Sequence, residues 1–241
     1  MVSNEEISVN KRNGRGKESL QIDKIHAMVG FATEGITGVS ASHVEMNSGI
    51  QFYDGINTED IQQILIKSAN DLISLENPNY QYVAARLLLF SLRKSLYGRL
   101  EEIPHLWNHI HECVDKGVYD AEILSKYAKN EIYKINSWID HERDYLFTYA
   151  GLRQICDKYL VQDRSTGEVY ETPQFMYLLI AMTIFAEYPE EKRLDYVTRY
   201  YNAISRHKIN IPTPIMGGVR TPIRQFASCV LVDIDDTLDS I

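Results

Sequence analysis

Apolar residues recur with helical spacing along most of the chain, and runs of β-forming residues appear only near its beginning and its end. At the start, ISVNKRNGRGKESLQI alternates around Asn13-Gly14, a pair typical of type I′ turns, so it predicts a β-hairpin. Asp23 is expected to cap a helix over DKIHAMVGFATEG, which Gly35 ends in the left-handed conformation. SASHVEMNSGI predicts a shorter helix, and QFYDGI predicts a third strand.

Two longer helices follow in the first part of the chain. Thr58, with two acidic residues after it, opens TEDIQQILIKSANDLISL, whose apolar residues mark one face. NYQYVAARLLLFSLRKSLYG predicts a second helix that has a basic last turn and stops at Gly98. Residues 1–98 are therefore expected to form a compact unit of short strands and helices.

The middle of the chain keeps the helical pattern. The most apolar helix is expected over PQFMYLLIAMTIFAEYP, ended by Pro189, and an amphipathic helix over EEKRLDYVTRYYNAISRHK. VQDRSTGEVYETP is expected to form a turn with Thr166-Gly167 at its tip. Four shorter helices are predicted over 105–116, 120–127, 129–137 and 143–159.

The pattern changes after residue 210. INIPTPIMGGVRTPIRQFASCVLVDI combines prolines, glycines and β-formers, and its end suits a buried strand. The predicted fold is therefore mainly α with short β elements, and a new layer of structure begins near residue 211.

Composition narrows the class of protein. The 241 residues carry a formal charge of −8, which argues against general affinity for nucleic acid or anionic membranes. The N-terminus has no apolar run typical of a secretory signal, and no stretch is apolar enough to span a membrane. Three scattered cysteines are too few for a disulfide framework, so a cytoplasmic location is expected.

An acidic cluster near the end has two interpretations. Asp233-x-Asp235-x-Thr237 after an apolar run fits the opening motif of haloacid-dehalogenase-like phosphatases, where the first aspartate is the nucleophile. That chemistry needs a complete α/β fold after the motif, and only four residues follow Thr237. A strand end followed by an acidic turn is the favoured interpretation.

Histidines gather in HLWNHIHEC. His105 and His109 lie one helical turn apart and could share a metal ion, whereas His111 points elsewhere. No second group of ligands is evident, so these histidines and His141 are interpreted as surface residues and no metal is predicted.

Basic residues and one cysteine complete the candidates. Lys11, Lys24 and Lys94 are far apart in sequence, so the residues alone favour solvated surface charge over a polyphosphate site. Arg224 would favour a Cys229 thiolate if it folded nearby, although a lone cysteine in an apolar strand is usually a packing residue.

Longer strings, in order along nearly the whole chain, resemble the large subunit of class I ribonucleotide reductase. They are VNKRNG, IDKIH, IQFYDGI, NPNYQYVAARL, LRKSLYG, KYLVQDRSTGEVYETPQF, IPTPIMGGVRTPIRQFASCVL and DDTLDSI. The resemblance implies an enzyme of deoxyribonucleotide biosynthesis, which reduces ribonucleoside diphosphates by radical chemistry.

The resemblance also implies a domain order. Residues 1–98 resemble the ATP-cone, a helical bundle capped by a small β-sheet, which binds ATP as an activator or dATP as an inhibitor. Residues 99–210 resemble the helical region that follows, and residues 211–241 resemble the start of an incomplete ten-stranded α/β barrel.

Effector contacts are implied residue by residue. Cations and helix starts suit a triphosphate, which lysines and backbone N–H groups bind. Gln62 and Ser91 stand where histidines near the nucleotide are expected, so the strength of dATP inhibition is left open. The implied contacts are Lys11, Glu18, Ser19, Leu20, Gln21, Ile22, Asp23, Lys24, Thr58 and Lys94.

Two further sites are implied near the end of the chain. Thr213 and Ser228 resemble residues that hold the substrate diphosphate, and Cys229 resembles one of two cysteines that supply the reducing electrons and close a redox-active disulfide. The start of the site for specificity effectors is implied at Asp236, Thr237 and Leu238.

The remaining catalytic residues of the family cannot be assigned in this sequence. The chain is therefore expected to be the N-terminal part of a large subunit, either half of a split subunit or a truncated product, and inactive alone. Expected partners are the C-terminal part, a small subunit that carries the metal-radical cofactor, and a thioredoxin- or glutaredoxin-type reductant. A regulatory nucleotide-binding module without catalysis is the alternative.

Overall fold

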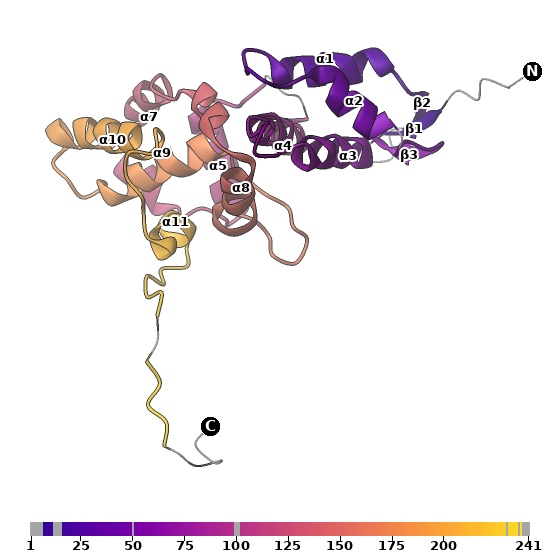
Figure 1. Ribbon diagram of the computed structural model, residues 1–241. Coiled ribbons are helices and arrows are strands. Elements are labelled where there is room, and N and C mark those ends of the chain that lie inside the picture. Colours follow the sequence, from indigo (N-terminus) through magenta and orange to yellow (C-terminus); the bar gives the residue numbers. More distant parts are fainter. Residues whose placement is uncertain are drawn as a thin grey trace, which may run out of the picture. The chain divides into compact units, whose positions relative to one another are not determined.

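The computed structural model describes residues 7–11, 16–49, 51–98, 102–229, 231–235 and 237 (Figure 1). The chain divides into two compact units. Unit 1 contains Met1–Pro104, Asp140–Leu160 and Glu171–Gln174, and unit 2 contains His105–Ile139, Val161–Tyr170 and Phe175–Ile241.

A three-stranded sheet stands at the start of unit 1. Strand β1 (Ser8–Asn10) pairs antiparallel with β2 (Lys17–Ser19), which confirms the hairpin; its predicted turn residues lie outside the described residues. Strand β3 (Ile56–Asn57) pairs parallel with β1, so the strand order is β2-β1-β3. The third strand is shorter than QFYDGI predicts, because Asp54 and Gly55 form a turn before it.

Four helices complete the first part of unit 1, as predicted. Their bounds are α1 (Ile22–Thr33), α2 (Ala41–Gly49), α3 (Thr58–Asp71) and α4 (Tyr80–Tyr97). Val29, Leu65 and Leu87 from α1, α3 and α4 are completely buried, so the helices meet in one apolar core. Gly98 ends α4 at φ 74°, the left-handed conformation that glycine adopts without steric cost.

The predicted capping role of Asp23 is wrong. Gln21 is the N-cap of α1 and makes no side-chain cap hydrogen bond, and Asp23 lies inside the first turn. A carboxylate in the first turn still interacts favourably with the helix dipole, which explains why the residue type suggested a helix start.

The single helix predicted over 143–159 is also wrong. The structure has a 3₁₀ segment η2 (His141–Leu146), helix α8 (Tyr149–Gln154) and a π-helical turn η3 (Ile155–Tyr159). Phe147 is extended, and the Thr148 hydroxyl accepts a hydrogen bond from the Gly151 N–H, which starts α8 afresh. Periodicity alone does not detect such a restart, because Thr148 caps a helix in the middle of an apolar pattern.

Unit 2 is built from helices around a large apolar core. Completely buried side chains include Ile110, Ile132, Leu178 and Tyr201. After η3, Gln162 and Val169 form an isolated antiparallel bridge around the predicted turn, where Gly167 has φ 76°. The helices are α5 (Leu106–Asp115), α6 (Glu122–Lys126), α7 (Lys129–Asn136), α9 (Pro173–Ile184), α10 (Glu190–Ile204) and α11 (Thr213–Gly218).

Three predictions for unit 2 are corrected. Helix α9 ends at Ile184, five residues before Pro189, and Pro189 is instead the N-cap of α10. Helix α11 was not expected in a sequence rich in proline and glycine, although proline in the first turn is compatible with a helix. The strand predicted up to Ile234 does not form in the described residues 223–229 and 231–235 (Figure 1).

The apolar side chains of that stretch are exposed. Leu231 is 98% accessible and Val232 70% accessible. A strand needs a hydrogen-bonding neighbour, and none of the described segments supplies one here. Among the described helices, none is both long enough and apolar enough to cross a membrane.

Candidate functional site

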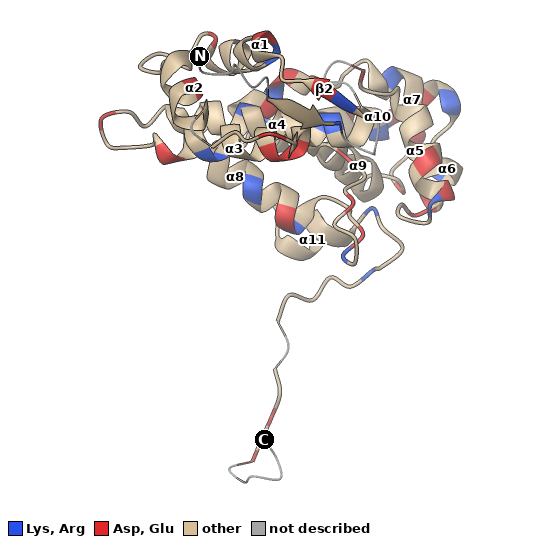
Figure 2. Cartoon of the chain, turned by 90° about the vertical axis from the view of Figure 1, so that its right-hand side faces the viewer, with Lys and Arg blue, Asp and Glu red and all other residues tan. Residues whose placement is uncertain are grey.

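A charged cluster joins the hairpin to the first helix of unit 1. The Lys11 ammonium lies 2.7 Å from the Glu18 carboxylate, and the Lys24 ammonium lies 3.7 Å from its other oxygen. Figure 2 shows basic and acidic positions next to each other on β2 and in the first turn of α1. Three of the ten implied effector contacts are thus brought together, although they are scattered in sequence.

The lysines also determine the protonation of Glu18. The hydrogen bond from Lys11 and the charges of Lys11 and Lys24 lower the pKa of Glu18. Glu18 is therefore ionised at neutral pH and holds both ammonium groups at the same place. The two cations are available to a polyanion that reaches them from solvent, because all three side chains are partly exposed.

The start of α1 lies directly behind this cluster. Leu20 is bound into the hairpin, since its N–H donates to the Ile7 carbonyl over 2.8 Å. Gln21 offers no side-chain cap, so the first turn of α1 presents backbone N–H groups without a side-chain acceptor. Ile22 is exposed by 58% at this end. Such a helix start, flanked by lysines, has the charge and the donors that phosphate groups require.

Two other implied contacts lie on different helices of unit 1. Thr58 is the first residue of α3, after the N-cap Asn57, whose amide donates to Asp60 over 2.8 Å. Lys94 is half-buried in the last turn of α4. The structure thus puts all these positions in one unit, and the contacts described above join Lys11, Glu18 and Lys24.

Gln62 and Ser91 are both buried in unit 1. The Gln62 amide nitrogen lies 3.8 Å from the Met28 sulfur, so α3 touches α1 at this point. Both side chains are part of the packed interior of the bundle. A histidine at either position would place an imidazole ring in this interior.

The residues implied at the substrate site lie in unit 2. Cys229 is an exposed free thiol, and its sulfur lies 3.8 Å from the Ser228 hydroxyl. Thr213, also exposed, begins α11. Cys229 and Ser228 are adjacent in sequence, so their contact is local.

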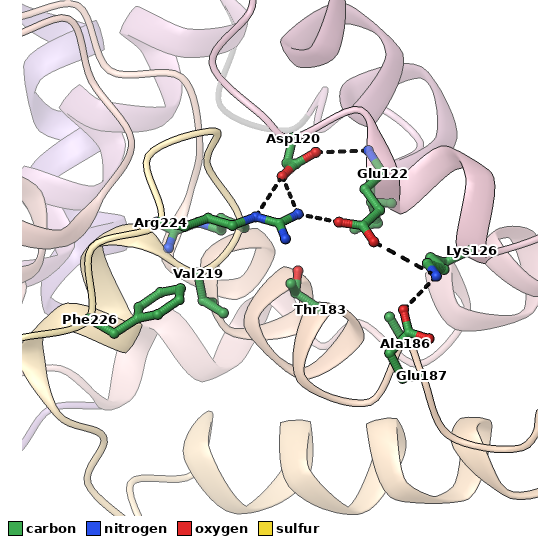
Figure 3. A pocket seen from close by; sticks show the side chains of 11 residues that line it. Asp120, Glu122, Lys126, Thr183, Ala186, Glu187, Val219, Arg224 and Phe226 are labelled. Carbon is green, nitrogen blue, oxygen red and sulfur yellow. Dashed lines mark hydrogen bonds and ion pairs between the residues drawn. The ribbon is translucent and has the colours of Figure 1, made fainter.

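Arg224 is not the partner of Cys229 that its spacing suggested. Its guanidinium binds Asp120 at 2.6 Å and also Glu122, both at the start of α6 (Figure 3). Hydrogen bonds from the Glu122 N–H and from Arg224 lower the pKa of Asp120. This ion-pair group, missed from the sequence, ties residue 224 to a segment about a hundred residues away, so no local pattern announces it.

A pocket of about 210 Å³ lies beside this ion-pair group. Its lining combines the two acids and Arg224 with the Lys126–Glu187 ion pair at 2.5 Å and the ring of Phe226 (Figure 3). Apart from Arg220, whose guanidinium donates to the Met216 carbonyl, the charged side chains that line this pocket are paired with one another, which makes it a structural junction.

The acidic end of the chain gives little geometry. Asp236 and Leu238, implied at the specificity-effector site, lie outside the described residues. The Thr237 N–H donates to the Asp235 carbonyl over 2.8 Å, as in a tight turn. Asp233 and Asp235 are exposed on the irregular stretch.

The sequence suggested that these histidines lie on the surface, and for His109 this is wrong. His109 is buried, stacks on Phe175, and has its Nε2 atom 3.0 Å from the Tyr119 hydroxyl. His105 accepts a hydrogen bond from the Trp107 N–H and is the N-cap of α5. Among the described residues, no three metal-binding side chains are grouped as a metal ion would require.

Comparison with known proteins gives two family matches. Residues 7–95 match the ATP cone domain, and residues 145–224 match the all-alpha domain of ribonucleotide reductase. The chain is 52% identical to ribonucleoside-diphosphate reductase 1 subunit alpha of Salmonella typhimurium and 51% identical to that of Escherichia coli, over 99% of its own length. It is 47% identical to the reductase alpha subunit of enterobacteria phage T4 over 98% of its length. The chain spans 31% of the length of each of these relatives.

Proposed function

We propose that this chain, which belongs to the ribonucleotide reductase alpha-subunit family, binds ATP and dATP as allosteric effectors through a cone domain over residues 1–98. The observation that carries the proposal is the Lys11–Glu18–Lys24 cluster at the uncapped start of α1, inside the matched residues 7–95. An anion-binding helix start and two cations meet there on one module.

Each implied contact has a role that its position supports. The ammonium groups of Lys11 and Lys24 bind phosphate oxygens as point charges. Within the implied stretch from Glu18 to Lys24, the first turn of α1 supplies N–H donors, the Thr58 hydroxyl adds a donor at the start of α3, and Lys94 adds a third ammonium group.

Calorimetric titration of the chain with ATP and with dATP tests this role. Lys11→Ala and Lys24→Ala are each expected to weaken binding at least about tenfold, because a hydrogen bond to a charged group contributes about 1.5–3 kcal/mol. Lys67→Ala is the matched control, since Lys67 is an exposed lysine of α3 paired with Asp71. An unchanged affinity in both Lys11→Ala and Lys24→Ala, or an equal loss of affinity in all three variants, would count against the proposed site.

The second part of the proposal concerns reduction of ribonucleoside diphosphates. Together with the rest of a reductase alpha subunit, Cys229 is proposed as one of two thiols that supply the electrons and close a disulfide. The accessible Cys229 thiol supports this, because exchange chemistry requires access. Thr213 and Ser228 are proposed to bind the substrate diphosphate, and Asp236, Thr237 and Leu238 to begin the specificity-effector site.

The proposed domains follow the same assignment. Residues 99–210 form the helical region, and residues 211–241 begin the ten-stranded barrel once neighbouring strands are present. The exposed side chains of Leu231, Val232 and Ile234 support this, since a barrel strand would bury them.

The proposed partners are the rest of the alpha subunit, a radical-generating small subunit that carries the metal-radical cofactor, and a thioredoxin- or glutaredoxin-type reductant. Three free cysteines in the described residues are compatible with a reducing cytoplasm, which is the proposed location.

Turnover of the reconstituted system tests the catalytic part. The chain, the complementary part of the alpha subunit, the small subunit and the dithiol reductant are mixed with a ribonucleoside diphosphate. Activity is expected from the mixture and not from the chain alone. Cys229→Ser should abolish it, whereas Cys156→Ser, a buried cysteine of unit 1, should not. Turnover that survives Cys229→Ser would overturn the assignment.

A second candidate function is a regulatory module without catalysis. The irregular, exposed setting of Cys229 favours it, because the described residues form no barrel strand around this thiol. Tight ATP binding combined with a silent reconstituted mixture would select this alternative.

A further inference from the structure

The segment that follows residue 140 is bound to helix α4 of the cone by a buried ion pair. The Arg93 guanidinium donates to the Asp144 carboxylate over 3.0 Å and to the His141 carbonyl over 2.8 Å. Asp144 is 1% exposed, and its other oxygen accepts a hydrogen bond from Gln174 over 2.8 Å. His141 and Asp144 of η2 are thus both held to α4 by hydrogen bonds from Arg93.

Tyr145, the next residue of η2, contacts α1 and α4, two of the three helices that carry proposed effector residues. Its ring lies 5.4 Å from the Arg86 guanidinium and 5.7 Å from that of Arg93, both on α4. Its ring centroid lies 6.3 Å from that of Phe31 on α1, in an edge arrangement. Tyr145 thus packs against α4 through two cations, which favour the face of an aromatic ring, and against α1 through Phe31, which also contacts Phe90 of α4 directly.

Arg86 adds a second link at the same place. It donates to the Glu34 carbonyl over 2.6 Å, just after the end of α1, while its guanidinium faces Tyr145. The end of α1 is thus held to α4 by a hydrogen bond and to η2 by the contact of Phe31 with Tyr145.

These contacts lie on the same helices as proposed effector residues. The proposed phosphate-binding residues of α1 stand at its start, and Phe31 stands near its end. Lys94, a proposed effector contact, follows Arg93 on α4. A helix of twelve residues transmits a shift of one end to the other, because it moves as a rigid rod about 18 Å long.

We propose that Tyr145, held in place by the Arg93–Asp144 ion pair, couples effector binding at the cone to the packing of segment 140–146 on α1 and α4. The inference rests on the proposed function, because it concerns the same nucleotide. Tyr145 is a positioning residue and does not touch the effector.

Thermodynamic linkage gives the expected sign. The contact orders α1 and α4 in advance, so a nucleotide that binds both helices does not have to order them itself. Loosening the contact weakens nucleotide binding, and the nucleotide in turn tightens the contact by the same factor.

Titration calorimetry with ATP on three variants of η2 tests the inference. Tyr145→Leu removes the aromatic contacts and is expected to weaken binding about fivefold or more. Tyr145→Phe keeps the ring and should bind within twofold of the unchanged chain. Glu142→Gln, an exposed change on the same segment, should also leave binding unchanged. Tighter binding by Tyr145→Leu, or a loss smaller than fivefold, overturns the coupling.

A general loss of stability must be separated from coupling. Glu131→Gln weakens the buried ion pair with Arg193 in unit 2, so it destabilises the chain without touching unit 1. This variant is expected to bind ATP as the unchanged chain does. An equal loss in Glu131→Gln and Tyr145→Leu would overturn the inference, because the effect would then be unspecific.

Hydrogen exchange on the unchanged chain gives an independent reading if Tyr145→Leu does not fold. Saturating ATP should slow exchange of the amides over 140–146. Unchanged exchange there, with ATP bound, overturns the coupling and leaves the proposed function standing. A failure of the unchanged chain to bind ATP or dATP overturns the proposed function and the coupling with it.

Discussion

Arg93 and Asp144 form an ion pair in which the guanidinium nitrogen lies 3.0 Å from the carboxylate oxygen, and their side chains are only 8% and 0% exposed. The two residues are fifty-one positions apart in sequence. Removing one partner of such a pair leaves a buried charge without compensation, whereas removing both is nearly neutral.

Arg93→Met is therefore expected to lower the free energy of unfolding of unit 1 by about 3–5 kcal/mol. Amide exchange of α4 is the suitable measurement, because both tryptophans, Trp107 and Trp138, lie in unit 2. The double variant Arg93→Met with Asp144→Leu should recover most of the loss. A loss below about 1 kcal/mol in the single variant would show that the Asp144 charge is compensated elsewhere.

The stability of unit 1 is expected to depend on pH through Asp144. Burial raises the pKa of Asp144 to about 6, above its value in the unfolded chain. The folded state therefore binds this proton more tightly than the unfolded chain does. Protonation of Asp144 contributes most to the free energy of unfolding below about pH 4, and this contribution is lost as pH rises to about 6.

The measurement compares the unchanged chain with Asp144→Asn from pH 4 to pH 7, by amide exchange of α4 corrected for intrinsic rates. As pH rises, the free energy of unfolding of the unchanged chain should fall relative to that of Asp144→Asn. Asp54→Asn is a nearly flat control over this range, because hydrogen bonds from Ser8 lower the pKa of Asp54, so that its contribution to stability is lost only as pH falls below about 4. A difference that stays flat for Asp144→Asn contradicts the prediction.

One thiol should react much faster than the other two in the folded chain. Cys229 is exposed, whereas Cys113 and Cys156 are buried, and burial raises the pKa of Cys156 to about 12. Titration with a chromogenic disulfide reagent should therefore give one fast equivalent, and three after unfolding. Cys229→Ser should remove the fast phase; a fast phase that remains would show that a buried cysteine is accessible.

His207, three residues after the end of α10, has a backbone conformation that glycine adopts more easily. Its φ is 55°, and the Lys208 N–H donates to the Ala203 carbonyl over 2.9 Å, as in a Schellman motif. His207→Gly is expected to raise the free energy of unfolding of unit 2 by up to about 1 kcal/mol relative to His207→Ala, because the alanine keeps the Cβ atom. Tryptophan fluorescence in urea measures this, and a glycine variant no more stable than the alanine variant would contradict it.

The chain pattern predicts the helices well because their information is local. The hairpin, the helix that starts at Thr58 and the stop at Gly98 follow from spacing, turn residues and glycine chemistry within a few positions. Its family follows from the sequence as well, since long strings specify it and the matched relatives confirm it. The predicted cap at Asp23 fails because a first-turn acid and an N-cap look alike in sequence.

Contacts between distant residues were decided by the tertiary structure alone. Arg224 pairs with Asp120 and not with Cys229, Lys11 meets Lys24 through Glu18, and Arg93 finds Asp144. None of these pairings has a periodic signature, because side chains meet only after the helices have packed. The run ending at Ile234 shows the same limit for backbone: its residues favour a strand, but a strand forms only where another chain segment supplies its hydrogen bonds.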